Sequence, residues 1–256
     1  MRGFGIDASV PVDVACDVAA MVSAKRYTSF WVNGSPHEGA LEILEAAAEI
    51  VDLPLGVGVF PLPKISAREL VTEIRRRGIP QDRLLLGVGS GRSPGALSEV
   101  REAVAIFRSE LDVTVVTGAV GPKMTSLAGE ISDGVIFTWS IAAEIMASRS
   151  ILDEAAGTAN RPSPTVISFV RCALLPEARH AVDERATAYG AIPHYKAVFE
   201  RHGLEAVETV VTGRNRNELL PGIESEEAVL DMSVIRAIPS ANTTDAIGRL
   251  VAACAP

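Results

Sequence analysis

The sequence predicts a single (β/α)8 barrel domain that spans residues 1–256. Short apolar runs alternate with amphipathic helical segments along most of the chain. The runs are continuous rather than alternating, which is typical of strands that are covered on both faces. Eight strand–helix units in 256 residues is the number that closes a parallel barrel. An open, doubly wound sheet is the alternative fold.

The expected strands are rich in β-branched and aromatic residues and end at Gly or Pro breaks. They comprise residues 3–6, 29–32, 55–60, 84–88, 113–117, 135–139, 166–173 and 232–238. Gly3-x-Gly5-x-x-Ala8 superficially matches a dinucleotide-binding fingerprint, but it lies inside the first strand rather than in the turn after it. We therefore interpret it as part of a strand.

The expected helices lie between these strands. Apolar residues at positions 14, 18, 21 and 22 share one helical face, as do those at 100, 104, 107 and 111. Ser66 and Glu69 form a capping box at the start of another helix. Pro122 suits the first turn of a helix, and apolar residues at 246–251 indicate a last one.

The spacing of the strands changes after the seventh. The preceding strands begin roughly 20 to 30 residues apart, whereas about 60 residues separate strand 7 from the last strand. We expect an extra helical segment between strands 7 and 8, at residues 176–230. It is either a packing elaboration, for instance a dimer surface, or a wall of the substrate pocket.

Composition excludes several classes of protein. The formal net charge of −8 argues against a general nucleic-acid-binding surface. The three cysteines are far apart, so that we expect neither a disulfide framework nor a metal ribbon, and no other metal-binding spacing occurs. No apolar run reaches the length of about 18 residues that a membrane helix needs, and the N-terminus lacks a signal-peptide core. We expect a cytoplasmic protein without metal.

Ligands of such a barrel bind where the strands end. Two of these ends are rich in glycine: residues 87–91 after strand 4, and residues 118–121 after strand 5, directly before Pro122 and Lys123. Glycine lets backbone N–H groups approach a ligand, and a helix N-terminus favours phosphate. The pattern indicates a phosphate-bearing cofactor, although tight turns alone also require glycine.

Two large side chains near strand ends are further candidates. Arg171 lies within the seventh strand among apolar residues, so that its charge needs a partner. That partner is either a phosphate or carboxylate of the ligand or an acidic residue of a neighbouring strand. Trp139, at the end of strand 6, lies beside a bound ring system or plugs the barrel.

Three segments carry a family resemblance: residues 55–59, 84–91 and 118–135. The last contains Gly-Pro-x-Met, Leu-Ala-Gly-Glu and Asp-Gly-Val in that order. With them the chain resembles the luciferase-like monooxygenase superfamily, which includes bacterial luciferase, FMN-dependent monooxygenases and coenzyme F420-dependent oxidoreductases. It is most similar to the F420-using branch, and the resemblance extends over nearly the whole chain.

The resemblance implies a cofactor, F420 or alternatively FMN, a small-molecule substrate and a homodimer. It places a cis peptide bond at Gly58–Val59, behind the flavin ring, and the cofactor tail at residues 118–122. The cofactor-binding residues that we expect are Asn33, Gly58, Val59, Gly89, Ser90, Gly91, Gly118, Ala119, Val120, Gly121, Pro122, Lys123 and Trp139. Arg92 and Arg171 are the residues expected to contact substrate.

The chain departs from its relatives at their acid/base positions. Asn33-Gly34 stands where many F420-using members have Asp-His, and Arg92 stands where some have Glu. His37 and Asn33 are the remaining catalytic candidates, although His37 also suits a solvated helix start. We expect F420-dependent hydride transfer, with an FMN monooxygenase or a catalytically silent cofactor-binding barrel as alternatives.

Overall fold

The computed structural model describes residues 1–91 and 94–256. Within them, eight strands, all except β8, close into a parallel barrel. The strands run in chain order from β1 to β7, and β9 lies between β7 and β1. Their bounds are β1 Arg2–Ile6, β2 Phe30–Val32, β3 Leu55–Pro61, β4 Leu84–Gly89, β5 Thr114–Gly118, β6 Gly134–Phe137, β7 Thr165–Leu174 and β9 Met232–Ala237. The predicted barrel is confirmed, and the open sheet is excluded because β6 pairs with β7.

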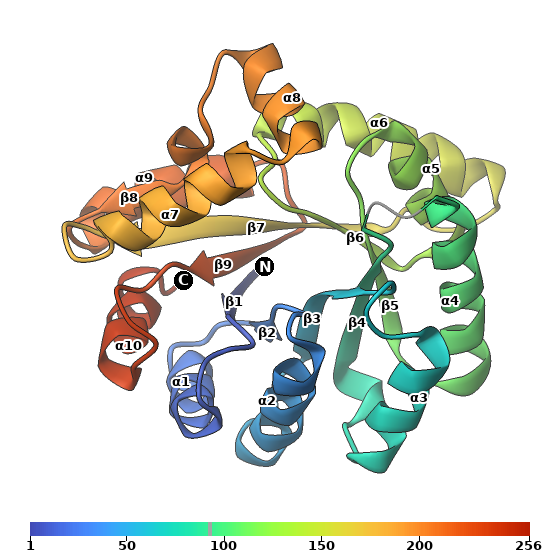
Figure 1. The fold of residues 1–256 in the computed structure, drawn as a ribbon, viewed down its shortest axis with the longest axis horizontal. Coiled ribbons are helices and arrows are strands. Elements are labelled where there is room, and N and C mark those ends of the chain that lie inside the picture. The colour runs from blue at the N-terminus through green and yellow to red at the C-terminus, as the bar shows by residue number, and fades with distance from the viewer. Residues whose placement is uncertain (92–93) are drawn as a thin grey trace.

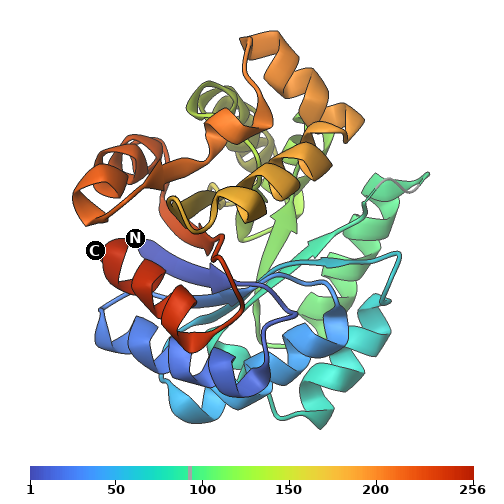
Figure 2. The same ribbon diagram turned by 60° about the vertical axis from the view of Figure 1, so that its left-hand side comes forward.

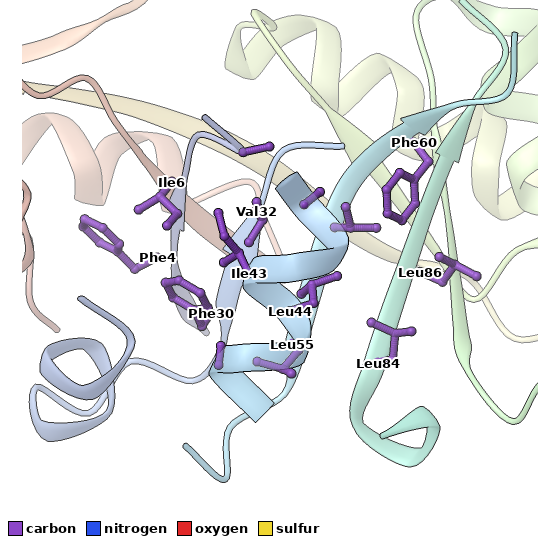
Figure 3. Packing of buried hydrophobic residues seen from close by; sticks show 14 of the residues in the cluster. Phe4, Ile6, Phe30, Val32, Ile43, Leu44, Leu55, Phe60, Leu84 and Leu86 are labelled. Atoms are coloured by element: carbon purple, nitrogen blue, oxygen red, sulfur yellow. The ribbon is translucent and has the colours of Figure 1, made fainter. Parts of the chain in front are cut away.

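Helices surround the barrel (Figure 1). Those of the regular units are α1 Val12–Ala24, α2 His37–Ile50, α3 Ala67–Arg76, α4 Ala96–Glu110, α5 Pro122–Ile131, α6 Ala142–Thr158 and α10 Thr244–Ala253, with a 3-10 turn, η1, at Gln81–Arg83. Their apolar faces pack on the outer side chains of the strands. In Figure 3, Ile43 and Leu44 of α2 lie beside Val32 and Leu55 of β2 and β3.

Helix starts follow the local sequence. The Ser66 side chain accepts a hydrogen bond from the Glu69 N–H, and the Glu69 side chain accepts one from the Ser66 N–H, so that the predicted capping box is confirmed. Pro122 occupies the first position of α5, as predicted. The preceding Gly121 has φ +97°, a backbone conformation that favours glycine.

Large side chains fill the interior of the barrel. Trp31 and Phe169 pack edge to face there, with 6.4 Å between ring centroids. The Trp31 Nε1 donates a hydrogen bond to the Ser29 Oγ at 2.8 Å, which satisfies a buried polar atom. A Cβ at Gly56 would overlap the Trp31 ring, so that glycine is needed beside it.

The extra segment after β7 is confirmed. It contains α7 Arg179–Gly190, α8 Pro193–His202, a 3-10 turn η2 at Ala206–Thr209, β8 Val211–Gly213 and α9 Arg216–Glu227. Helices α7 and α8 project from the barrel on the side away from α1 and α2 (Figures 1 and 2). With Trp139 they form a separate apolar cluster around Tyr195 and Phe199.

Strand β8 was not predicted. It pairs with the last residues of β7, beyond the point where β6 ends. Cys172 shows the arrangement, because it pairs with Val211 on one side and with Ala237 of β9 on the other. Strand β8 therefore pairs with the edge of β7 that β6 leaves unpaired, and it connects the extra segment to the barrel.

The two ends of the chain lie side by side, as both views show (Figures 1 and 2). Arg2 joins them: its guanidinium donates two hydrogen bonds of 2.7 Å to the Glu227 carboxylate. Its Nη1 also donates to the carbonyl oxygens of Cys254 and Ala255. Within the described residues, no helix is long and apolar enough to span a membrane.

Candidate functional site

A cavity of about 1160 Å³ lies at the carboxyl ends of the barrel strands. Every barrel strand, or the loop directly after it, contributes lining residues, including Asp7 after β1, Asn33 after β2 and Arg171 within β7. The extra segment supplies a wall from Arg185, Tyr189, Ile192, His194 and Tyr195. The extra segment therefore forms a wall of the cavity, while a dimer surface on the same segment stays a prediction.

The end of β3 forms the floor of the cavity. The peptide bond between Gly58 and Val59 is cis, as expected, and the register between β3 and β4 shifts between Val57 and Phe60. Val59 lines the cavity together with Ile136 and Phe169 from below. The floor is therefore an apolar surface made by side chains of β3, β6 and β7 and not by charged groups.

The glycines around this floor make room for Val59. A Cβ at Gly89 would lie 2.9 Å from the Val59 Cγ2, and one at Gly118 would lie 3.2 Å from its Cγ1. A Cβ at Gly58 would lie 2.6 Å from the Phe169 Cζ. Part of the glycine pattern that sequence analysis assigned to a cofactor thus serves the packing of one side chain.

The loop from Gly118 to Lys123 lines the cavity on the β5 side. Helix α5 begins there without an acidic residue in its first turn and without a side-chain cap. The N–H groups of the first turn of a helix have no intrahelical acceptor and carry partial positive charge. Gly121, Pro122 and Lys123 are exposed, so that these donors and the Lys123 ammonium are accessible from the cavity.

Ser90 and Gly91 line the cavity after β4. Ser90 is buried, and Gly91 has φ +60°. Arg92, expected to contact substrate, lies outside the described residues.

The two catalytic candidates lie in different places. His37 begins α2 and lines a second, smaller pocket between α2 and α3, outside the cavity. Asn33 lines the cavity, but its amide is engaged by the backbone. Its Oδ1 accepts a hydrogen bond from the Ala8 N–H at 2.5 Å, and its Nδ2 donates to the Ser35 carbonyl at 2.9 Å. Asn33 thus joins the loops after β1 and β2.

An ion-pair cluster that sequence analysis missed lies on the β1 and β9 side. The Arg236 Nη2 donates to the Asp7 Oδ1 at 2.7 Å, and Arg185 of α7 donates to the other carboxylate oxygen. Burial raises the pKa of Asp7, but the two guanidinium groups outweigh it, so that the pKa lies below its ordinary value. Asp7 therefore remains a carboxylate and holds α7 against the barrel.

Arg171 and Trp139 contact each other across the top of β6 and β7. The guanidinium carbon of Arg171 lies 3.9 Å from the centroid of the Trp139 ring and 5.6 Å from that of Tyr189. The Arg171 Nη2 donates to the Thr138 Oγ1 at 2.5 Å. Burial lowers the pKa of Arg171 to about 9. Of its two expected partners, an acid from a neighbouring strand is not found among the described residues.

Trp139 belongs to the apolar cluster of the extra segment. It is 2% exposed and packs on Tyr189 and Phe199, with 4.8 Å and 6.4 Å between ring centroids. It also lines the cavity. Its Nε1 is buried and has no hydrogen-bond partner among the described residues.

Asp7, Arg236, Arg185 and His194 are among the polar cavity residues that sequence analysis did not select. Arg236 carried the same signal as Arg171, a cation inside an apolar strand. Arg185 and His194 lie in helices where no pattern distinguishes them. Within the described residues, no group of three His, Cys, Asp or Glu side chains is placed to hold a metal ion.

No family model and no curated protein matches the chain. Solved structures do. The coenzyme F420-dependent tetrahydromethanopterin reductase from Methanopyrus kandleri superposes with a TM-score of 0.75 and 15% identity, over 99% of this chain and 97% of that one. An F420-dependent secondary alcohol dehydrogenase in complex with an F420-acetone adduct superposes with a TM-score of 0.75 and 15% identity, over 100% of this chain and 98% of that one.

An FMN-binding structure is similar as well. The oxygenating constituent of 3,6-diketocamphane monooxygenase from Pseudomonas putida, a type II Baeyer-Villiger monooxygenase in complex with FMN, superposes with a TM-score of 0.71. It is 13% identical, over 100% of this chain and 97% of that one. At 13–15% identity these neighbours confirm the fold that the resemblance implies.

Proposed function

We propose that the protein is a luciferase-like oxidoreductase that binds coenzyme F420 in the cavity and transfers a hydride between this cofactor and a small organic substrate. The observation that carries the proposal is the arrangement of the cavity. An apolar floor at Val59 lies next to the open first turn of α5 and Lys123. F420-dependent enzymes among the solved structures share the fold over their whole length.

The residues present fit such a cofactor. The cavity, at about 1160 Å³, exceeds the size of ordinary small-ligand pockets, which are roughly 300–1,000 Å³. Val59, Ile136 and Phe169 offer a flat ring an apolar surface. The first turn of α5 and Lys123 offer a phosphate hydrogen-bond donors and positive charge.

Each part of the chain has a separate task in this proposal. The floor at Val59 supports the ring from behind, while the α5 end holds the phosphate-bearing tail and so orients the ring. The α7–α8 wall, held by the Asp7–Arg185 ion pair, excludes water from the reacting face. A bound deazaflavin supplies the chemistry by accepting or donating a hydride, that is, one proton with two electrons.

FMN is the alternative cofactor, because the same fold binds FMN in a neighbouring structure. In that case reduced flavin would react with oxygen, and the protein would be a monooxygenase. The apolar floor and the α5 end serve either ring and either phosphate.

Titration of the protein with F420 and with FMN, followed by the fluorescence of each cofactor, tests the proposal. We expect micromolar binding of F420. Gly121→Val should weaken it by about tenfold to a hundredfold, because a β-branched side chain at φ +97° distorts the loop that holds the phosphate.

Gly78→Val is the matched control. Gly78 also has a positive φ, +63°, and open space around its Cβ, but it follows α3 outside the cavity. Its variant should bind the cofactor like the wild type. Binding of FMN alone would select the monooxygenase, and binding of neither cofactor would contradict both forms of the proposal.

A further inference from the structure

Two buried arginines lie side by side at the top of the barrel. Arg171 of β7 and Arg236 of β9 are direct partners in the register of the two strands. They are 8% and 6% exposed, and both line the cavity. Like charges at directly paired positions of a sheet repel each other, and burial strengthens the repulsion. This pair therefore needs negative charge nearby.

The described residues provide one carboxylate for three cavity arginines. Asp7 binds Arg236 and Arg185, and both of its oxygens are used. Arg171 has the hydroxyl of Thr138 and the faces of two aromatic rings as its partners. Burial of a guanidinium without a carboxylate is unfavourable, in accordance with the lowered pKa of Arg171. The wall thus has an excess of positive charge.

This positive region is separate from the α5 end. Arg171 lies in β7, Arg236 lies in β9 and Asp7 follows β1, whereas the loop at Gly121 follows β5. In the order of strands around the barrel, β6 lies between β5 and β7, and β6 and β7 lie between β5 and β9. The cavity therefore has two regions that suit negative charge, and they come from different strands.

We propose that Arg171, assisted by Arg236 and Arg185, binds an oxyanion of the organic substrate, so that the substrate is a carboxylate or a phosphate ester. The inference rests on the proposed function, which places the phosphate-bearing tail of the cofactor at α5. The planar guanidinium of Arg171 suits the two oxygens of such a group. Trp139, Tyr189 and Tyr195 line the cavity beside it and offer surface to the organic part.

The test uses butanoate and monobutyl phosphate as probes and butanamide as the uncharged analogue of butanoate, at constant ionic strength. Binding is followed by tryptophan fluorescence, because Trp139 contacts Arg171 directly. We expect at least one of the two anions to bind about tenfold or more tightly than the amide. Arg171→Met, which removes the charge and keeps an unbranched apolar side chain, should remove this preference.

Arg179→Met is the control for Arg171→Met, because Arg179 is an exposed residue of α7 outside the cavity. It should leave the preference for anions unchanged. Arg185→Met provides a second variant at a side chain that is 34% exposed and less critical for folding. This variant should also weaken the preference for anions over butanamide, but by less than Arg171→Met does, because Arg185 already binds Asp7.

Cofactor binding separates the two proposals. Arg171→Met should leave the F420 or FMN affinity within about twofold of the wild type, and Gly121→Val should leave the binding of the anions unchanged. Equal binding of butanoate, monobutyl phosphate and butanamide overturns the inference. So does a loss of cofactor affinity in Arg171→Met as large as that in Gly121→Val. Anion preference without cofactor binding would contradict the proposed function alone.

Discussion

Two buried arginines at opposite ends of the barrel differ in their partners. Arg2, at the start of β1, donates to both oxygens of Glu227 and to two carbonyl groups of the C-terminal residues. The hydrogen bonds to Glu227 raise the pKa of Arg2. Arg171, near the end of β7, has a hydroxyl and two aromatic rings, and burial lowers its pKa to about 9.

The difference in partners indicates that Arg2 stabilises the fold, whereas Arg171 is available to bind a ligand. At the end where the strands begin, the chain satisfies its own charge and so fixes its termini together. At the end where the strands finish, it leaves a guanidinium facing a cavity, at a cost in folding free energy that a bound anion can offset. This division agrees with the general placement of ligand sites in barrels of this kind.

Arg2→Met should have the largest effect on stability. The substitution leaves Glu227 without its cation and two terminal carbonyl groups without their donor. Breaking a largely buried pair of this type lowers the free energy of unfolding by about 3 kcal/mol or more. Urea denaturation measures this loss in the free energy of unfolding. The affinity of the folded variant for F420 or FMN should equal that of the wild type. A stability equal to that of the wild type would show that the pair is dispensable.

The contribution of Arg2 should depend on pH through Glu227. Burial raises the pKa of Glu227, but hydrogen bonds from Arg2 and Ser233 outweigh it, so that the pKa lies below its ordinary value of 4.5. The stabilisation is therefore complete above that value and is lost as the pH falls through the lowered pKa. The stability difference between wild type and Arg2→Met should narrow in acid. A difference that stays constant down to the acid transition would contradict this assignment.

Gly58→Ala tests the packing of the floor. The new Cβ would lie 2.6 Å from the Phe169 Cζ and 3.0 Å from the Ile136 Cδ1. Overpacking of this degree destabilises by about 1–3 kcal/mol, because both neighbours are held inside the barrel. Thermal denaturation measures the loss. Gly157→Ala, where a Cβ meets no atom within 4 Å, is the control and should not destabilise the protein.

Arg171→Met should have the smallest effect on stability. It removes a buried charge without a carboxylate partner, together with the contact of the guanidinium with the Trp139 ring, and methionine keeps an apolar side chain at the site. We expect the free energy of unfolding to change by less than about 1 kcal/mol, or to rise. A loss as large as that in Arg2→Met, measured in the same urea experiment, would show that Arg171 is a structural residue like Arg2.

The fold could be predicted from sequence because its signals are local. Each strand appears as a continuous apolar run, and Pro122 and the Ser66–Glu69 pair mark helix starts. Strand β8 could not be predicted in this way. Its three residues, Val211–Gly213, become a strand because the end of β7 has a free edge there, which is a property of the assembled barrel.

The site was predictable in part for the same reason. The segment 58–59 lies near the end of a strand, the segments 89–91 and 118–123 begin where strands end, and strand ends meet at one face of a barrel. The arginine cluster instead depends on register, since the pairing of Arg171 with Arg236 joins residues from distant segments. His37 shows the opposite failure: it lies close in sequence to β2, yet the first turn of α2 carries it away from the cavity.

Backbone hydrogen–deuterium exchange with and without the cofactor that binds, F420 or FMN, tests the division between the two ends most directly. The account predicts that the cofactor protects segments 58–62 and 118–125 and leaves the exchange of the residues around Arg2, Glu227 and Cys254 unchanged. Protection confined to the pocket at His37, or to the end of the barrel at Arg2, would contradict it.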